Sequence, residues 1–320
     1  MFLQCVLLVA GLVFVVLGAD LLVDGASSVA RRFGLSEFVI GLTIVGIGTS
    51  APEMVVSFIG AAKGNADIAV GNVVGSNIMN TLLILGLTAM ILPMDITPLN
   101  RKRDMPVNLV VTVILIFLGM EYTLFGWGTE DGLSRVDGAI MLLLFVAYMM
   151  VSFLQKGQEE AAVEEQGKQK SVGVSLLYIL GGLVGLVVGG RLFVDSATDI
   201  ARALHVSDKF IAVTILAGGT SMPELATCLV AAAKKKGQLA LGNIIGSNVF
   251  NILLILGGSA LIHPLSFAHI GYVDLGVVLV SAILLYLSEY TGIRHKLDRF
   301  DASLFLLVWL LYFVNLFNEL

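Results

Sequence analysis

Long apolar blocks separated by short polar segments run along almost the whole chain of 320 residues. Blocks of about 20 residues that are apolar on every side are typical of transmembrane helices. The chain is 57% hydrophobic and 13% charged, whereas a soluble domain is about 25% charged. The pattern predicts an all-α polytopic membrane protein with ten transmembrane helices, at 2–26, 37–62, 68–92, 106–124, 136–153, 173–197, 208–233, 239–262, 270–289 and 302–318.

The chain also repeats itself after 171 residues. Residues 21–53 align without gaps with 192–224, and residues 69–86 align with 240–257. Each half then holds five helices, and an odd number makes the second half enter the membrane from the opposite side. Two inverted five-helix repeats are typical of secondary transporters. We expect a first repeat at 1–154, a linker at 155–171 and a second repeat at 172–320.

Basic residues predict the orientation of the chain. Of its 19 Lys and Arg residues, 14 lie in the loops that follow the odd-numbered helices. Loops rich in Lys and Arg stay in the cytoplasm. We therefore expect both termini outside and the acidic 155–171 linker in the cytoplasm. No basic stripe of the kind that binds nucleic acid is present.

The second and seventh predicted helices carry the same polar interruption, which reads GTSAPE in one and GTSMPE in the other. Pro52 and Pro223 each remove a backbone N–H and break the helix. Broken backbone at membrane depth is tolerated only where protein or a water-lined cavity satisfies it. Glu53 and Glu224 each cost at least about 2.5–3.5 kcal/mol as ionised groups there. They are tolerated if they share a cation or hold protons, and the inverted symmetry can bring them face to face.

A second polar motif reads GNVVGSNIMN in the third helix and GNIIGSNVFN in the eighth. Ser76 and Asn80 are four residues apart and share a helix face, as do Ser247 and Asn251. We interpret Asn80 and Asn251 as ion ligands. The glycines allow close helix packing, and we interpret the other asparagines of the motif as packing residues: Asn72, Asn77, Asn243 and Asn248.

The chemistry of these donors restricts the ion. Carboxylates, amides, hydroxyls and carbonyls are hard oxygen ligands, which suit calcium, sodium or magnesium rather than zinc or copper. Magnesium gives up its water reluctantly and prefers a strict octahedron, so a flexible cage with two negative charges suits calcium best. Two or three sodium ions on separate oxygens also fit such a cage. Competition between calcium and sodium for the same glutamates is all that an exchanger needs. We expect no cofactor.

At these motifs the chain resembles the sodium/calcium exchangers of the calcium/cation antiporter superfamily, prokaryotic type. The resemblance implies alternating access, in which outer helices slide across a fixed core, in the lipid bilayer of a prokaryotic inner membrane. We expect the chain to function as a monomer. By similarity, Glu53 and Glu224 are the central calcium ligands, shared with sodium. The other implied site residues are Thr49, Thr220, Gly46 and Ala217 through backbone carbonyls, the serines Ser50, Ser221, Ser76 and Ser247, and the central Asn80 and Asn251.

Asn251 departs from relatives that carry Asp at this position, potassium-dependent exchangers among them. With one negative charge fewer, we expect exchange of Na⁺ for Ca²⁺ without K⁺. One alternative is an H⁺/Ca²⁺ antiporter, in which protons replace sodium on the glutamates. A Ca²⁺ channel is a second alternative, although channels place charged rings around one axis of an oligomer. No nucleophile–base arrangement indicates an enzyme.

Overall fold

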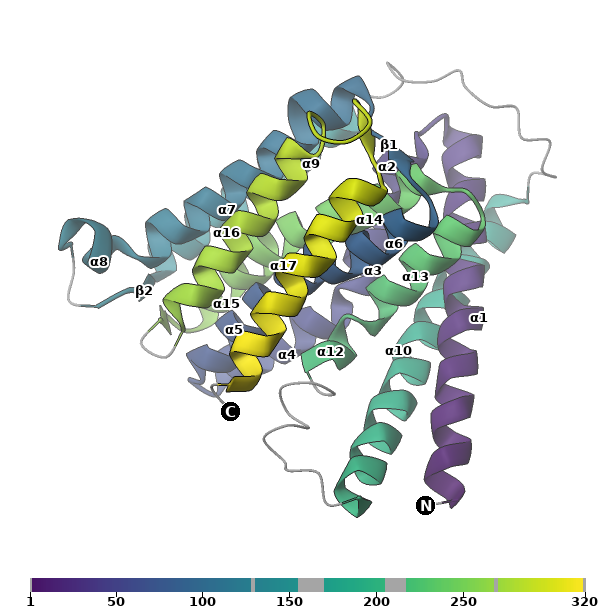
Figure 1. Cartoon of the computed structure of the whole chain (residues 1–320), viewed down its shortest axis with the longest axis horizontal. Helices are drawn as coiled ribbons and strands as arrows, with labels where there is room; N and C mark the ends of the chain where they lie inside the picture. The colour runs from purple at the N-terminus through teal and green to yellow at the C-terminus, as the bar shows by residue number, and fades with distance from the viewer. Residues whose placement is uncertain (1, 128–129, 155–169, 205–216, 268–269, 319–320) are drawn as a thin grey trace.

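The computed structural model describes residues 2–127, 130–154, 170–204, 217–267 and 270–318. These residues form helices joined by turns and by four strands of two residues each (Figure 1). Several membrane helices contain π-helical stretches, labelled η, in which the backbone winds one residue wider than in an α-helix.

In the first half, helices follow the order of the five predicted spans. The first span is one long helix, the second is interrupted, and the third changes from α to π and back. In chain order the elements are α1 (Phe2–Phe33), α2 (Glu37–Ile40), η1 (Gly41–Val45), α3 (Gly46–Thr49), α4 (Ala51–Ala62), α5 (Ala66–Ile78), η2 (Met79–Leu85), α6 (Gly86–Ile91), β1 (Met94–Asp95), η3 (Asn100–Asp104), α7 (Met105–Gly119), α8 (Glu121–Phe125), β2 (Gly132–Leu133) and α9 (Arg135–Leu154).

The second half repeats this order. The start of its interrupted helix, predicted at 208–233, lies partly outside the described residues. Its elements are α10 (Val172–Ala203), α12 (Ala217–Thr220), α13 (Met222–Ala233), α14 (Gly237–Phe250), η5 (Asn251–Leu256), α15 (Gly257–Ile262), β3 (Leu265–Ser266), α16 (Tyr272–Leu287), β4 (Lys296–Leu297) and α17 (Arg299–Asn318).

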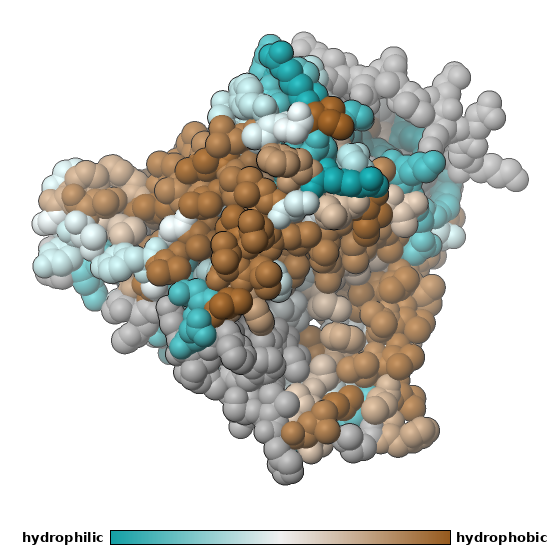
Figure 2. Space-filling model, viewed as in Figure 1, coloured by the Kyte–Doolittle hydropathy of each residue, from teal (hydrophilic) through white to brown (hydrophobic). Residues whose placement is uncertain are grey.

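The lengths and surfaces of these helices suit a membrane. Among the described residues, 6 helices are long and apolar enough to cross it, and the bent pair Glu37–Thr49 and Ala51–Ala62 makes a seventh. Met222–Ala233 and Tyr272–Leu287 are apolar but shorter. Figure 2 shows apolar residues covering most of one face, over α16 and α17, between more polar ends. The fold is therefore the predicted all-α, polytopic one.

Helices α1 and α10 lie side by side at one edge of the molecule (Figure 1). Their backbones touch, because a Cβ atom on Gly18 would lie 2.7 Å from the Leu186 nitrogen and one on Gly182 would lie 2.7 Å from the Gly18 oxygen. Small residues allow such close approach in membranes. The first helices of the two repeats therefore form one two-helix unit, which meets the rest of the protein mainly where α1 packs along α13.

Two small β-ribbons connect the repeats. Strand β1 pairs antiparallel with β4, and β2 pairs antiparallel with β3. In each ribbon, the segment after the third helix of one repeat meets the segment before the fifth helix of the other. The two halves are thus interlocked at both ends of the bundle, as expected for repeats related by a two-fold axis in the membrane plane.

The two helices that carry the asparagine motifs occupy the centre. The helix Gly237–Ile262 is almost entirely buried, and Ala66–Ile91 is buried over most of its length. A Cβ atom on Gly246 would lie 2.8 Å from the Leu42 Cα atom, so α14 packs directly against the backbone of the second helix. Helix packing thereby brings the polar motifs of both repeats into one central layer.

Candidate ion-binding site

The repeated GTSxPE motif produces the same break in both halves. The second membrane helix bends by 47° at Ser50, between α3 and α4. Pro52 lies in the first turn of α4, where its missing N–H needs no partner. Glu53 also lies in this first turn, and Pro223 and Glu224 repeat the arrangement at the start of α13. The positive end of each helix dipole therefore faces a carboxylate, which stabilises its charge.

Each glutamate accepts a hydrogen bond from the opposite repeat. Ser50 Oγ donates to Glu224 Oε1 at 3.1 Å, and Ser221 Oγ donates to Glu53 Oε1 at 3.3 Å. Both carboxylates are buried, at 1% exposure. In each repeat the serine lies three positions before the glutamate, so the two side chains are near neighbours. Because each serine also bonds the glutamate of the opposite repeat, the two carboxylates lie within about a helix diameter of each other, 10–12 Å. The inverted repeats meet at this point.

Five buried oxygen atoms in this region have no hydrogen-bond partner among the described residues. They are Glu53 Oε2, Glu224 Oε2, Ser247 Oγ, Asn80 Oδ1 and Asn251 Oδ1. Buried polar atoms are almost always paired, and all five of these are electron-pair donors. The described residues hold no cluster of three or more His, Cys, Asp or Glu side chains. The arrangement therefore fits an oxygen-coordinated cation held by two carboxylates and neutral oxygens.

The central asparagines are oriented by asparagines of the opposite repeat. Asn251 Nδ2 donates to Asn77 Oδ1 at 2.9 Å, and Asn80 Nδ2 donates to Asn248 Oδ1 at 3.2 Å. Because the nitrogen of each amide is engaged, its oxygen is turned the other way. The sequence indicated only packing for Asn77 and Asn248, although their conservation between the repeats at one fixed offset was a signal of a shared role.

The π-helical stretches coincide with this layer. Stretch η2 begins at Met79, one residue before Asn80, and η5 begins at Asn251. Such wider turns are frequent at functional sites because they displace a side chain from the regular helical stripe. Hydropathy and spacing did not predict them.

The two threonines of the breaks bind asparagines of the opposite repeat through their side chains. Thr49 Oγ1 donates to Asn243 Oδ1 at 3.1 Å, and Thr220 Oγ1 donates to Asn72 Oδ1 at 3.4 Å. Asn72 Nδ2 in turn donates to the Glu53 carbonyl at 3.2 Å. Asn72 and Asn243 therefore connect the breaks across the two-fold axis and do more than pack helices together.

The remaining predicted ligands lie around the same centre. Ser76 is 3% exposed, and its Oγ atom lies 3.3 Å from Ser221 Oγ, within hydrogen-bond distance. The Gly46 carbonyl already accepts from the Ser50 N–H at 3.1 Å and lies 3.4 Å from Thr49 Oγ1. Ala217 is the first residue of α12. The sequence prediction placed both backbone carbonyls at sodium sites, and that assignment stays a prediction.

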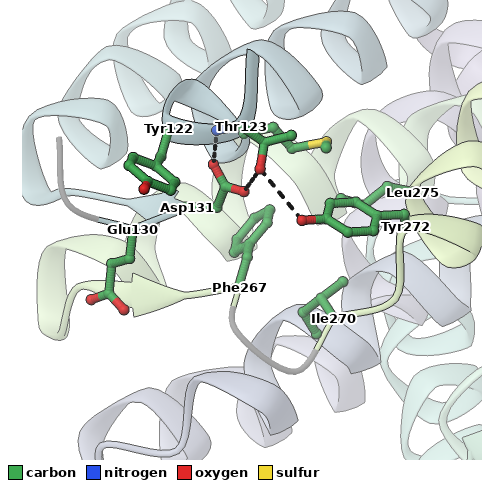
Figure 3. A pocket seen from close by; sticks show the side chains of 9 residues that line it. Tyr122, Thr123, Glu130, Asp131, Phe267, Ile270, Tyr272 and Leu275 are labelled. Atoms are coloured by element: carbon green, nitrogen blue, oxygen red, sulfur yellow. Dashed lines mark hydrogen bonds between the residues drawn. The ribbon is translucent and has the colours of Figure 1, made fainter. Parts of the chain in front are cut away.

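A separate cavity of about 260 Å³ lies beside α8 and the β2–β3 ribbon (Figure 3). The Asp131 carboxylate points at Thr123 and accepts hydrogen bonds from its N–H at 2.8 Å and from its hydroxyl at 2.5 Å. The Tyr272 hydroxyl lies 3.4 Å from the same threonine oxygen. None of the predicted ligands lines this cavity, so it is distinct from the candidate ion site.

Comparison with known proteins agrees with this geometry. The family described as sodium/calcium exchanger protein matches residues 3–154 and 174–318. An uncharacterised membrane protein of Methanocaldococcus jannaschii is 36% identical over 96% of this chain and 95% of its own length. The sodium/calcium exchanger MaX1 of Methanosarcina acetivorans is 32% identical over 97% of both chains. A solved structure of the sodium–calcium exchanger NCX_Mj superposes with a TM-score of 0.85, at 34% identity and 98% coverage of both chains. The chain belongs to the sodium/calcium exchanger family.

Proposed function

We propose that this transporter exchanges Na⁺ for Ca²⁺ by alternating access and does not require K⁺. The observation that carries the proposal is the set of five buried oxygen atoms that have no hydrogen-bond partner in the described part of the chain, two of them from carboxylates of opposite repeats. Relatives and a solved structure that are named as sodium/calcium exchangers support the same choice of ions.

The charge and flexibility of the cage favour calcium as one substrate. Calcium takes six to eight oxygen ligands at variable angles, and Glu53 with Glu224 would neutralise its two charges. Ser50, Ser221 and the central asparagines would complete the shell. Two or three sodium ions spread over the same oxygens would compete with calcium, because both ions need the two carboxylates.

Among the described residues no third acidic side chain joins Glu53 and Glu224, and this supports independence from potassium. Asn80 and Asn251 occupy equivalent places in the two repeats, and both are neutral. A site with two negative charges is balanced by one calcium ion, and a further potassium ion would add an uncompensated charge in a region of low dielectric constant.

The remaining features of the proposal concern the whole protein. Both termini would face outward and the 155–171 linker would face the cytoplasm, because basic residues concentrate on the linker side. The protein would act as a monomer in a prokaryotic inner membrane. The two repeats within one chain already supply both halves of the ion cage.

Transport by the purified protein in sealed liposomes tests the proposal. We expect calcium uptake when sodium is loaded inside, no effect of potassium, and no uptake by the double variant Glu53→Gln with Glu224→Gln. Uptake driven by a pH gradient without sodium would instead establish an H⁺/Ca²⁺ antiporter. Calcium flux down its own gradient, with no counter-ion required, would establish a channel.

A further inference from the structure

Asn77, Asn248 and Thr81 lie just outside the candidate ion cage and form a connected hydrogen-bond network. We propose that these three side chains are positioning residues, which hold the amide oxygens of Asn251 and Asn80 toward the ion and thereby set the affinity of the site. This inference rests on the proposed function and extends it to residues that touch no ion.

The need for positioning follows from the chemistry of the amide group. A carboxamide has an acceptor oxygen and a donor NH₂ of nearly the same shape. A rotation by 180° would turn N–H groups toward a cation and remove a ligand. The bonds from Asn251 Nδ2 to Asn77 Oδ1 and from Asn80 Nδ2 to Asn248 Oδ1 oppose this rotation.

The outer asparagines need orientation in their turn, because they must present oxygen rather than nitrogen. Asn77 Nδ2 donates to the Asn248 carbonyl at 3.2 Å. Asn248 Nδ2 donates to Thr81 Oγ1 at 2.8 Å. All three side chains are at most 2% exposed, so water does not compete for these bonds. The network therefore runs from Thr81 through Asn248 to Asn80.

Thr81 is the one position of this network where the repeats differ, since Ile252 occupies the equivalent place 171 residues later. The Asn248 amide therefore donates to a side-chain hydroxyl, whereas the amide of its counterpart Asn77 donates to a backbone carbonyl. This makes Thr81 a suitable point of intervention, because it can be changed without touching any predicted ligand.

The test compares Thr81→Val, which removes the hydroxyl at nearly constant shape, with Thr81→Ser, which keeps it. Thr88→Val is the matched control, because the buried Thr88 hydroxyl bonds to the Ile84 carbonyl of its own helix, at 2.6 Å, and to no other described residue. Equilibrium binding of radioactive calcium to purified protein and the KM for calcium uptake are measured together. Loss of an outer-shell partner typically weakens metal binding about 10–100-fold.

We expect that loss for Thr81→Val, near wild-type affinity for Thr81→Ser, and no change for Thr88→Val. Wild-type affinity in Thr81→Val, or equal losses in all three variants, would overturn the inference. If Thr81→Val does not fold, Thr81→Ala must show the same loss of affinity. If the wild-type protein itself binds no calcium, the proposed function fails. If it binds and Thr81→Val is unchanged, only the positioning role fails.

A second inference, carried by separate contacts, concerns the attachment of α1 to the rest of the protein. Lys234, the residue that ends α13, places its Nζ atom 2.7 Å from Asp20 Oδ1 and 2.6 Å from Asp24 Oδ1. Partial burial lowers the pKa of Lys234, but the hydrogen bonds that its ammonium group donates to the Asp20 and Asp24 carboxylates outweigh this and raise the pKa. Lys170 also pairs with Asp24, at 3.4 Å. The two-helix unit is therefore held to the core by charge at this end.

The residues equivalent to Lys234 and Asp24 in the other repeat are not paired with each other in the structure. The repeat offset of 171 residues maps Lys234 onto Lys63 and Asp24 onto Asp195. Both Lys63 and Asp195 are exposed, and neither makes an ion pair within the described part of the chain. Likewise α1 packs along α13, whereas α10 makes no comparable contact with the equivalent helix α4. The structure is thus asymmetric about its own two-fold axis.

The geometry points to an alternating latch: Lys63 binds Asp195 in the opposite transport state, and Lys234 then releases Asp24. Inverted repeats support this exchange, because swapping their conformations generates the state open to the other side. Arg191 occupies the place equivalent to Asp20, so the second latch lacks one acid. Asp199, one turn beyond Asp195, can supply another.

Cysteine cross-linking with a bifunctional thiol reagent, long enough to span a Lys–Asp pair and cleavable by reduction, tests the latch. The background is Cys5→Ser with Cys228→Ser, and Ser57 already occupies the place equivalent to Cys228. One variant pairs Lys234→Cys with Asp24→Cys and the other pairs Lys63→Cys with Asp195→Cys. We expect both pairs to cross-link during turnover, each cross-link to stop transport, and reduction to restore it. Lys235→Cys with Asp195→Cys, from opposite ends, is the control that should not cross-link. Absence of the 63–195 cross-link in every ionic condition, while 234–24 forms, would overturn the latch.

Discussion

At the scale of single residues, the candidate site is assembled across the two-fold axis. Glu53 accepts from Ser221 of the other repeat, and Glu224 accepts from Ser50. Each carboxylate therefore has one oxygen held by the opposite repeat and one oxygen left for a ligand. Neither repeat alone could orient its own glutamate, which explains why both copies of the motif keep the serine and the acid together.

Neutralising either glutamate should abolish calcium transport while the protein still folds. Two unit charges 4 Å apart in a region of effective dielectric constant 20 attract each other by about 4 kcal/mol. A carboxylate beside the divalent calcium ion gains at least that much, which corresponds to about three orders of magnitude in affinity. We therefore expect Glu53→Gln and Glu224→Gln each to reduce calcium binding by about that factor or more. Titration of the purified protein with calcium measures the loss. Glu130→Gln, at an exposed acid, is the control, and equal binding by a site variant and this control would contradict the assignment.

At the scale of elements, the last helix of each repeat begins with the same reciprocal cap. At α17, Asp298 Oδ1 accepts from the N–H groups of Phe300 at 2.8 Å and Asp301 at 3.3 Å, while Asp301 Oδ2 accepts from the Asp298 N–H at 3.2 Å. At α9, Ser134 and Asp137 form the equivalent bonds. This capping box sets the start of each helix directly after its β-ribbon, so the ribbon and the helix are positioned together.

The cap on α17 should make stability depend on pH in the acidic range. Burial raises the pKa of Asp298, but hydrogen bonds from the N–H groups of Ile293, Phe300 and Asp301 outweigh it and lower the pKa below 3.8. The stabilisation is therefore complete above that pH and is lost as the pH falls through the lowered value. We expect Asp298→Ala to cost about 0.5–2 kcal/mol at pH 7, measured by thermal unfolding in detergent.

Low pH should remove the difference in stability between the wild-type protein and Asp298→Ala. The gap in Tm between wild type and Asp298→Ala should narrow as the pH is lowered from 5 to 3. A gap that widens over this range would show that the ionised cap does not stabilise the helix. Asp298→Asn, which keeps an acceptor oxygen, should lie between the two at pH 7.

Close packing of α1 against α10 gives a second prediction at this scale. A side chain at Gly18 would meet the backbone of the partner helix, and overpacking typically costs about 1–3 kcal/mol. We expect Gly18→Leu to lower the Tm and to impair transport. Gly181→Leu is the matched control on α10, because a Cβ atom there meets nothing within 4 Å. Equal effects of the two substitutions would show that the glycine contact is not what holds the pair together.

At the scale of the whole molecule, the inverted repeat dictates which ends of the protein share a side of the membrane. In the proposed topology, five helices per repeat would place both termini on one side and the linker on the other. We expect a membrane-impermeant thiol reagent, applied to intact cells lacking the outer membrane, to label Leu3→Cys and to leave Val163→Cys unlabelled in a Cys5→Ser background. Labelling of the linker in intact cells, with an unreactive N-terminus, would reverse the proposed orientation.

The sequence alone determined the features that depend on neighbours along the chain. The order of the membrane helices follows from runs of apolar residues, and the breaks at Pro52 and Pro223 follow from a missing N–H in a helix. The repeat offset and the odd number of helices together predicted the inverted symmetry, and the cost of burying Glu53 and Glu224 singled them out as candidate ligands. Each of these inferences uses local spacing or composition, which no tertiary contact has to supply.

Only the tertiary structure decided which side chains meet across the axis. Asn77 and Asn251, 174 residues apart in sequence, are bonded at 2.9 Å, and Lys234 lies against Asp24, whereas Asp195 makes no ion pair with any described residue. The π-helical stretch that contains Asn80 depends in the same way on its surroundings. Such contacts depend on the register and rotation of helices from different repeats. An asparagine can turn either its oxygen or its nitrogen toward an ion, and its orientation is set only when a residue distant in sequence bonds the nitrogen. That physical dependence on long-range packing is why the sequence indicated the cage but not its orientation.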